Sequence, residues 1–282
     1  MKTIGFIDYY LDEWHANKYP QWIADASGGE LKVTCAYGLA DAPAGRTNAD
    51  WARDMDIELL GSIEEVIERC DYLIVLSPDH PEYHEELAQR PLRSGKPTYI
   101  DKTFAPDRET ALRLFQLAEQ HGTPLFSSSA LRFAPEYKEA AGKPIDMLFS
   151  QGPGRYSNYA VHQLEPIVML MGANPDRIMS IGTEQTPSLL VGYPDGRQAV
   201  MAHLQGGPFR LAWQEKDGQA SAQTAEADFF ASFIEHLLQF FQTGRPPVDS
   251  AETIAIMTCI EYGAQAMAQP HQWIALPATT RE

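Results

Sequence analysis

Lys102 is the residue of this sequence whose type and position first point to chemistry. It follows the apolar run at residues 97–100 and stands in the triplet Asp101-Lys102-Thr103. Another apolar run, at residues 72–76, precedes it, and a stretch with helical features separates the two. In open sheets of alternating strands and helices, ligands bind outside the carboxyl ends of the strands. The sequence therefore predicts that Lys102 presents a cation to a ligand at the end of a strand.

His162 and Glu165 form a second candidate group. Their spacing places both on one face of a helix, where they could bind a common ligand or each other. A carboxylate near an imidazole raises the pKa of the imidazole and orients it, as general acid–base catalysis near neutral pH requires. The alternative, a structural histidine and a surface lysine, stays open when only these residues are considered.

Metal and disulfide chemistry find little support. His80 and His84 have the spacing of two ligands on one helix face, but no third ligand follows them, so we expect no metal site. Cys35, Cys70 and Cys259 are far apart in the sequence and form no CxxC pair. This pattern predicts buried thiols instead of a disulfide framework or a zinc site.

Composition and charge exclude several classes of function. A length of 282 residues with 44% hydrophobic and 21% charged residues is typical of a folded chain with about two domains. The formal charge of −16 argues against nucleic-acid and membrane-surface partners, because both are polyanions. We find no signal-peptide pattern and no apolar run of membrane-spanning length, and we expect a cytoplasmic protein.

The first part of the chain alternates strand and helix signals. Ser62 with Glu65 has the spacing of a capping box, and Asp107 can cap a helix that Gly122 ends. Continuous apolar strands between helices predict a parallel sheet covered on both faces, so we expect a doubly wound, Rossmann-like domain over residues 1–125. The apolar runs with the length of strands are residues 2–7, 31–37, 72–76 and the run ending at Ile100.

The remaining residues, 126–282, follow another pattern. Turn sequences at residues 193–196 and 216–218 are typical of hairpins that join antiparallel strands. Two amphipathic helices are expected at about residues 225–242 and 250–268. We therefore expect an α+β domain with a largely antiparallel open sheet, which would carry substrate binding and oligomerisation.

The first predicted strand lacks the loop of a standard dinucleotide site. Such a loop reads G-x-G-x-x-G, because glycines let a diphosphate approach a helix N-terminus. Here the chain reads Asp8-Tyr9-Tyr10-Leu11-Asp12-Glu13, and the second strand ends in Tyr37-Gly38 without a carboxylate for a ribose. The two tyrosines either fill the space of a diphosphate or stack on a ligand ring. Two interpretations stay open: a nicotinamide cofactor bound through a modified loop, or a different ligand.

Several segments, in this order and approximate spacing, resemble motifs of the Gfo/Idh/MocA family of NAD(P)-dependent oxidoreductases, which act mostly on sugars, cyclitols and related polyols. Ser77-Pro78 with His84 is similar to the family's T-P-x-x-x-H segment. Residues 94–103 resemble A-G-K-x-V-x-x-E-K-P, with Lys102 at the family's lysine. The further segments, residues 131–137 and 158–166, resemble R-R-F-x-P-x-Y and G-x-H-x-x-D-P.

This resemblance implies a site and its partners. Lys102 would polarise a substrate hydroxyl, His162 would take its proton, and Glu165 would support the histidine. The cofactor would be NAD or NADP, and the sheet of the second domain would pair subunits into a homodimer or homotetramer. Cofactor contacts are expected from Asp8, Tyr9, Tyr10, Ser77, Pro78, His80, His84 and Asp101, and substrate contacts from Arg132, Tyr156 and Tyr159.

The expected function is thus an NAD(P)-dependent dehydrogenase acting on a sugar, cyclitol or related polyol. One alternative is a non-redox carbohydrate-binding or regulatory protein that kept the fold and lost the dinucleotide. Another is a lyase or isomerase that reuses Lys102 and His162. The missing glycines favour these alternatives, whereas the retained Lys102 and His162 favour an enzyme.

Overall fold

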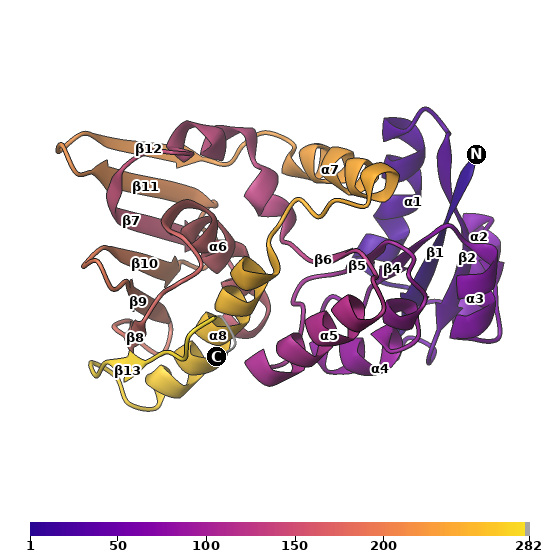
Figure 1. The fold of residues 1–282 in the computed structure, drawn as a ribbon, viewed down its shortest axis with the longest axis horizontal. Coiled ribbons are helices and arrows are strands. Elements are labelled where there is room, and N and C mark those ends of the chain that lie inside the picture. Colours follow the sequence, from indigo (N-terminus) through magenta and orange to yellow (C-terminus); the bar gives the residue numbers. More distant parts are fainter. Residues whose placement is uncertain (280–282) are drawn as a thin grey trace. The chain divides into compact units, whose positions relative to one another are not determined.

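The computed structural model describes residues 1–279, which form two compact units (Figure 1). The first unit comprises Met1–Ser127 and Ile234–Asp249. The second comprises Ser128–Phe233 and the described residues from Ser250 onward. The chain thus leaves the first unit after Ser127, and residues 234–249 later return to it.

A six-stranded parallel sheet forms the centre of the first unit, in the order β3-β2-β1-β4-β5-β6. This is the doubly wound order of Rossmann folds, and it confirms the predicted fold class. Most residues of the central strands are buried at consecutive positions, which requires cover on both faces. The strands are β1 (Lys2–Asp8), β2 (Leu31–Gly38), β3 (Glu58–Leu59), β4 (Tyr72–Val75), β5 (Thr98–Ile100) and β6 (Leu125–Phe126).

Local sequence signals explain where the helices of this unit begin. The Ser62 hydroxyl accepts a hydrogen bond from the Glu65 amide at 3.2 Å, and the Asp107 carboxylate accepts one from the Thr110 amide at 2.7 Å, as their positions predict. The helices are α1 (Trp14–Ala26), α2 (Asn48–Met55), α3 (Ile63–Arg69), α4 (His84–Ala88) and α5 (Arg108–Gln120), with short 3-10 segments at Pro81–Tyr83 and Pro91–Arg93.

Gly5 lies inside β1 and serves packing instead of ligand binding. A Cβ atom at this position would stand 2.3 Å from a side-chain methyl carbon of Val66 on α3. A larger residue would therefore push α3 away from the sheet. The glycine that the first strand does contain is thus used for helix contact, and the loop after the strand has none.

Strand order reverses between β1 and β4, and this places three loops side by side. Ile7 of β1 pairs with Val75 of β4, and Val75 pairs with Ile100 of β5. The residues that follow these strands therefore emerge at the same edge of the sheet. Asp8, Ser77 and Lys102 all lie at this edge, in the crevice where doubly wound sheets bind ligands.

The second unit is built on a seven-stranded sheet with the order β12-β11-β7-β10-β9-β8-β13. Among the described strands of this sheet, only β7 and β10 pair in parallel, and both predicted hairpins, β9–β10 and β11–β12, are confirmed. The strands are β7 (Ile145–Gly152), β8 (Arg177–Ser180), β9 (Ser188–Gly192), β10 (Gln198–His203), β11 (Arg210–Glu215), β12 (Ala220–Thr224) and β13 (Ile274–Ala275).

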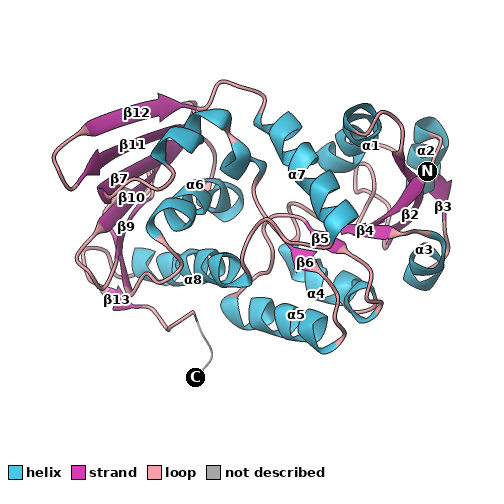
Figure 2. Cartoon of the chain, turned by 45° about the horizontal axis from the view of Figure 1, so that its top comes forward, coloured by secondary structure: helices cyan, strands magenta, loops and turns pink. Residues whose placement is uncertain are grey.

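Helices α6 (Tyr156–Met171) and α8 (Ser250–Met267) lie along one side of this sheet (Figures 1 and 2). Helix α7 (Phe229–Thr243) connects the two units in sequence, and 3-10 segments at Ala130–Phe133 and Pro135–Ala140 precede β7. Strand residues alternate between buried positions and more exposed ones, as expected for a sheet with one covered face.

The more exposed face of this sheet carries a row of apolar side chains. Phe149 is 47% exposed, and its neighbours along the hydrogen-bonding direction are also apolar. Pairing registers place the row across five adjacent strands, and each of the other four members is half-buried. The row is Ala212, Phe149, Val200, Leu190 and Met179.

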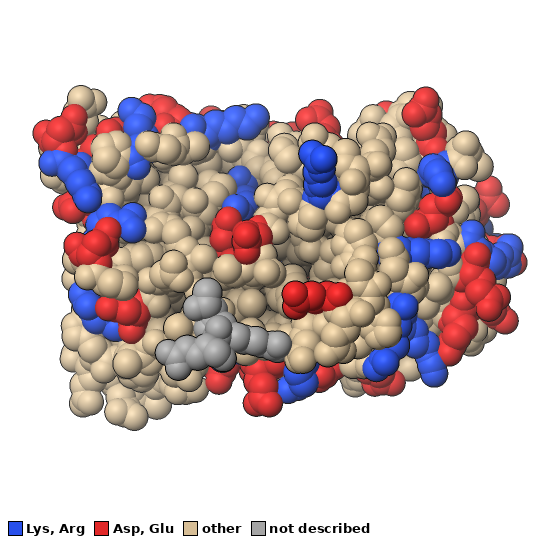
Figure 3. Space-filling model, viewed as in Figure 1, with Lys and Arg blue, Asp and Glu red and all other residues tan. Residues whose placement is uncertain are grey.

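Within residues 1–279, no helix is both long enough and apolar enough to cross a membrane. On the face drawn in Figure 3, Lys and Arg side chains are interspersed with Asp and Glu and form no continuous basic area.

Candidate functional site

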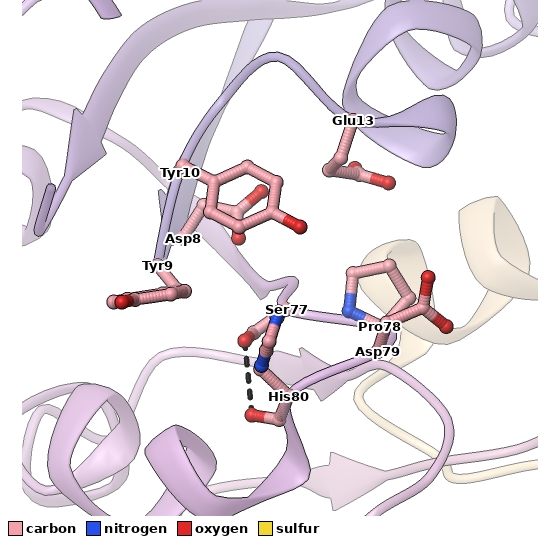
Figure 4. A pocket seen from close by; sticks show the side chains of 8 residues that line it. All are labelled: Asp8, Tyr9, Tyr10, Glu13, Ser77, Pro78, Asp79 and His80. Atoms are coloured by element: carbon pink, nitrogen blue, oxygen red, sulfur yellow. Dashed lines mark hydrogen bonds between the residues drawn. The ribbon is translucent and has the colours of Figure 1, made fainter. Parts of the chain in front are cut away.

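A small pocket lies at the point where the order of the parallel strands reverses (Figure 4). Its cavity volume is about 10 Å³, which is room for one group of the size of a water molecule. Six of its residues are among those expected to contact a cofactor; Glu13 and Asp79 are additional. The lining consists of Asp8, Tyr9, Tyr10, Glu13, Ser77, Pro78, Asp79 and His80.

Asp8 ends β1 and is only 1% exposed. Its Oδ2 atom has no hydrogen-bond partner among the described residues. Burial raises the pKa of this carboxyl well above its usual range, and the neighbouring charge of Glu13 adds to the effect. A buried acceptor without a donor is costly, so this oxygen is a position at which a ligand's hydrogen-bond donor would be stabilised.

Glu13 caps the N-terminus of α1 with its own side chain. One carboxylate oxygen accepts a hydrogen bond from the His15 amide at 2.7 Å, and the other accepts one from the Ala16 amide. Burial raises the pKa of Glu13 to about 7, although these amides and His15 favour its charged form. The first amides of α1 are thus already bound to an anion that belongs to the chain.

Asp101 lies beside this group but is fully engaged. One of its oxygens contacts Nδ1 of His15, and the other accepts a hydrogen bond from the Tyr99 hydroxyl at 2.9 Å. Burial opposes the charge of Asp101, but His15 overcomes it and lowers the pKa of Asp101 to about 2. Asp101 is therefore a charged partner of the His15 ring. Its negative charge also contributes to the raised pKa values of Asp8 and Glu13.

These residues do not fit the diphosphate of a dinucleotide in the usual manner. A helix N-terminus binds phosphate through free amides and the positive end of its dipole. At α1 the amides of His15 and Ala16 are bound to Glu13, and no Lys or Arg among the described residues lines the pocket. A diphosphate would displace one carboxylate and meet two others, Asp8 and Asp79.

The end of β2, where a ribose would be held, is also occupied by the chain. The Asn48 side chain donates a hydrogen bond to the Ala40 carbonyl at 2.7 Å and accepts one from the Leu11 amide at 2.9 Å. It packs directly above Gly38, where a Cβ atom would lie 2.4 Å from Asn48 Nδ2. Asp41 accepts a hydrogen bond from the Asn48 amide at 2.7 Å, so this nearby carboxylate is also engaged.

Lys102 lies at the same edge of the sheet, and its side chain is 12% exposed. Its ammonium donates a hydrogen bond to the Pro78 carbonyl at 3.3 Å and stands 4.0 Å from Asp79 Oδ1. The Lys102–Thr103 peptide bond is cis. These contacts hold the cation next to the pocket without making it part of the lining.

His84 connects the segments that follow β4 and β5. It is fully buried, and its ring nitrogens lie within hydrogen-bond distance of the Leu76 and Phe104 carbonyls. Burial lowers the pKa of His84. Because Leu76 precedes Ser77 and Phe104 follows Lys102 by two residues, His84 fixes the two segments that form this edge of the site.

In the second unit, Ser129 connects His162 to Glu165. The Ser129 hydroxyl lies 2.7 Å from Nδ1 of His162, and the Ser129 amide donates a hydrogen bond to Glu165 at 3.2 Å. The His162 ring packs edge to face against the rings of Tyr159 and Phe209, with centroid distances of 5.2 and 5.8 Å. The structure therefore orients His162 through a serine that the sequence analysis did not single out.

Arg132 and Glu165 form a buried ion pair, with an N–O distance of 3.0 Å and side chains 9% and 2% exposed. Arg132 also binds Glu252. Burial opposes the charge of Arg132, but the two glutamates raise its pKa, so the guanidinium stays charged. Glu165 also accepts a hydrogen bond from the Ser128 hydroxyl at 3.1 Å. Both members of the pair are thus committed to holding the segment that carries Ser129.

The two tyrosines of α6 are placed differently. The Tyr156 hydroxyl donates a hydrogen bond to the Ile260 carbonyl on α8 at 2.7 Å, so it ties two helices together. Tyr159 is 37% exposed and packs against Gly154, where a Cβ atom would lie 2.3 Å from its ring. Of the two, Tyr159 is the one whose ring reaches the surface beside His162.

No group of three or more His, Cys, Asp or Glu residues within the described part of the chain is arranged to hold a metal ion. His80 instead contacts Glu82 at 3.2 Å, and His84 contacts backbone carbonyls. His80 and His84, which have the spacing of metal ligands, therefore bind different partners and do not face a common point.

Sequence reasoning missed Glu13, Asp79, Asn48 and Ser129 as parts of these sites. An acidic residue directly before an apolar helical stretch was a signal for the Glu13 cap, since its side chain can accept from the first amides of the helix. Three serines at residues 127–129, after the apolar pair Leu125-Phe126, were a weaker signal for Ser129. Asn48 and Asp79 left no pattern, because their roles depend on loops brought together by the sheet.

Comparison with known proteins confirms the predicted resemblance. Residues 14–129 match the Gfo/Idh/MocA family model, described as an oxidoreductase family with an NAD-binding Rossmann fold. No match was found among curated proteins.

Several solved structures share the fold over nearly the whole chain. UDP-N-acetylglucosamine 3-dehydrogenase from Acidithiobacillus ferrooxidans is 16% identical, with a TM-score of 0.75 and coverage of 94% of this chain and 97% of that chain. Scyllo-inositol dehydrogenase from Lactobacillus casei is 14% identical, with a TM-score of 0.73 and coverage of 97% of this chain and 98% of that chain. GenD2 from gentamicin A biosynthesis, crystallised in complex with NAD, is 12% identical, with a TM-score of 0.77 and coverage of 99% of this chain and 97% of that chain. At these identities the likeness shows the fold alone.

The buried charge of Glu13 predicts a pH-dependent stability. Its pKa is about 7 in the folded chain against an ordinary value of 4.5, so the folded state binds more protons between these values. The free energy of unfolding should therefore fall as pH rises from 4.5 to 7, by on the order of 2 kcal/mol. Urea denaturation across this range should show a smaller fall for Glu13→Gln. The exposed Glu30→Gln is the matched control, and equal slopes in all three proteins would contradict the assignment.

The Arg132–Glu165 pair predicts a strong coupling. Arg132→Met leaves a buried carboxylate without its partner and should lower the free energy of unfolding by about 3–5 kcal/mol. Adding Glu165→Leu should recover part of that loss, because it removes the unpaired charge. Denaturant titration of the single and double variants measures the coupling, and purely additive effects would show that the pair does not act as a unit.

Proposed function

We propose that this chain, which resembles the Gfo/Idh/MocA oxidoreductase family, is an enzyme that acts on a hydroxyl-bearing carbon of a sugar, cyclitol or related polyol. The observation that carries this proposal is Lys102, a largely buried cation at the carboxyl end of β5. A cation held there by the Pro78 carbonyl can stabilise negative charge that develops on a substrate oxygen. A merely structural lysine would not need this position at the ligand-binding edge of the sheet.

His162 is the proposed proton carrier. Ser129 orients its ring, and Tyr159 and Phe209 limit its movement, which suits a group that transfers a proton in a fixed direction. Glu165 would act through Ser129, as a positioning residue, because its oxygens bind Arg132, Ser128 and the Ser129 amide. Arg132 would act in the same way, and Tyr159 is the better placed of the two tyrosines for stacking on a sugar ring.

Two kinds of function fit a site that holds such a hydroxyl, one redox and one redox-neutral. Oxidation with NAD or NADP is the reaction that the family match favours. A redox-neutral elimination or isomerisation, or plain carbohydrate binding, is favoured by the Glu13 cap and by Asn48 at the end of β2. Because the described residues do not fit the diphosphate in the usual manner, their geometry supports the redox-neutral enzyme better. We derive no step through a nicotinamide.

The proposal predicts turnover that depends on Lys102 and His162. Purified protein is incubated with a panel of sugars, cyclitols and sugar acids in deuterated buffer, without and with NAD(P). Proton NMR follows deuterium incorporation and product formation, and absorbance follows reduced nicotinamide. We expect redox-neutral turnover, lowered about 10²–10⁴-fold in Lys102→Ala and His162→Ala, because each removes charge stabilisation or proton transfer.

Lys32→Ala and His121→Ala, at exposed positions, serve as matched controls and should leave turnover unchanged. Turnover that is unchanged in Lys102→Ala or His162→Ala would reject the assigned role. Product formation that requires added NAD(P) and is accompanied by reduced nicotinamide would establish the oxidoreductase instead.

A second copy of this chain is the proposed partner of the β-sheet in the second unit. The apolar row that includes Phe149 crosses five strands on the more exposed face of this sheet. An apolar stripe of this extent is unusual on an isolated protein surface and typical of an interface. We propose a homodimer or homotetramer joined through this face.

Phe149→Asp places a charge at the most exposed side chain of this row and should weaken association at least tenfold, because the charge would have to be buried. Sedimentation velocity at several protein concentrations measures the change. Lys138→Gln makes the same change in net charge at an exposed position and should not alter the distribution. A Phe149→Asp protein with unchanged association would show that the row is not the interface.

A further inference from the structure

We infer that the pocket between β1 and β4 binds a positively charged amino group of a small molecule. It is lined by three acidic residues, Asp8, Glu13 and Asp79, and by Tyr9 and Tyr10 (Figure 4). Within the described part of the chain, no Lys or Arg side chain lines it. An ammonium group is the ligand that this combination of acids and aromatic rings would stabilise.

The unpartnered oxygen of Asp8 is the strongest single indication. Asp8 lines the cavity and is 1% exposed, and its Oδ2 atom has no hydrogen-bond donor among the described residues. A bound N–H group would supply that donor. The resulting charge-assisted hydrogen bond would offset the cost of keeping the carboxylate buried.

The aromatic side chains form the second part of the site. Tyr9 stacks on Tyr83 with ring centroids 3.9 Å apart, which fixes the Tyr9 ring in place. Tyr10 and His80 lie beside it, with centroids 5.3 and 5.2 Å from that of Tyr9. Rings held in this way can face a cation without losing conformational freedom on binding.

Size and ligand count separate an amine from other cations. The cavity volume of about 10 Å³ accommodates one small group, and a quaternary ammonium would be too large. A divalent metal needs several oxygen or nitrogen ligands around one point, and the described residues include no such cluster. A primary ammonium, with three N–H donors, needs only a few acceptors close to one side.

Together with the proposed function, on which this step rests, the site indicates the substrate class. The pocket and Lys102 lie at the same edge of the sheet, and Asp79 lines the pocket while standing 4.0 Å from Lys102 Nζ. A molecule whose hydroxyl meets Lys102 could place an amino group in the pocket. The substrate would then be an amino-substituted sugar, cyclitol or polyol.

Binding of methylammonium to the full-length protein tests the site without requiring turnover. Amide resonances of Tyr9 and Tyr10 are followed by two-dimensional NMR at pH 8, with sodium chloride as the ionic-strength control and tetramethylammonium as the size control. We expect saturable shifts with methylammonium alone, with a Kd on the order of millimolar for so small a ligand.

Asp8→Asn should weaken methylammonium binding at least tenfold, because it keeps the shape of the side chain and removes the charge. Asp25→Asn, at an exposed position of α1, should leave it unchanged. Absence of saturable shifts, equal shifts with tetramethylammonium, or equal affinity in Asp8→Asn would each overturn the site. Should Asp8→Asn fail to fold, Glu13→Gln provides the second variant, with the same expected loss.

The substrate class is tested by comparing glucosamine with glucose in the same NMR experiment. Glucosamine should shift the Tyr9 and Tyr10 resonances, and glucose should not. Equal effects would reject the amino-substituted class. Because these are binding measurements, they can succeed or fail independently of the turnover that Lys102 and His162 are proposed to support.

Discussion

The contact on which this site depends is the one between the Glu13 carboxylate and the first amides of α1. A helix N-terminus carries unpaired N–H groups and a partial positive charge, and some anion must satisfy them. In phosphate-binding folds that anion is a ligand. Here it is part of the chain, and its presence changes the chemistry of the whole crevice, because Asp8 and Asp101 lie within its field.

The chain neutralises its buried acids in different ways in the two units. Glu165 is paired with the Arg132 guanidinium, and the Asp101 carboxylate contacts the His15 ring and the Tyr99 hydroxyl. Among the described residues, Oδ2 of Asp8 has no hydrogen-bond donor, and the Glu13 carboxylate is bound by the amides of His15 and Ala16. Asp8 and Glu13 both line the pocket, which is where a cationic ligand would be bound.

Much of the fold could be predicted from local patterns. Ser62 and Asp107 cap helices as their positions indicate, and the turns at residues 193–196 and 216–218 join antiparallel strands. The placement of Lys102 at a strand end followed from the apolar runs around it. The return of residues 234–249 to the first unit could not be predicted, because it depends on long-range packing. The same holds for Asn48 and Ser129, whose partners are distant in sequence.

The acidic residues of the loop after β1 can be read from the sequence, but the contact of one of them with the N-terminus of α1 cannot. Only the structure connects Glu13 to the amides that a diphosphate would need. Titration of the protein with NADH and NADPH at pH 8, followed by nicotinamide fluorescence, tests this most directly, since Glu13 has a pKa of about 7 and is charged there. The Glu13 cap predicts no saturable binding up to millimolar dinucleotide, and saturable binding in the micromolar range would contradict it.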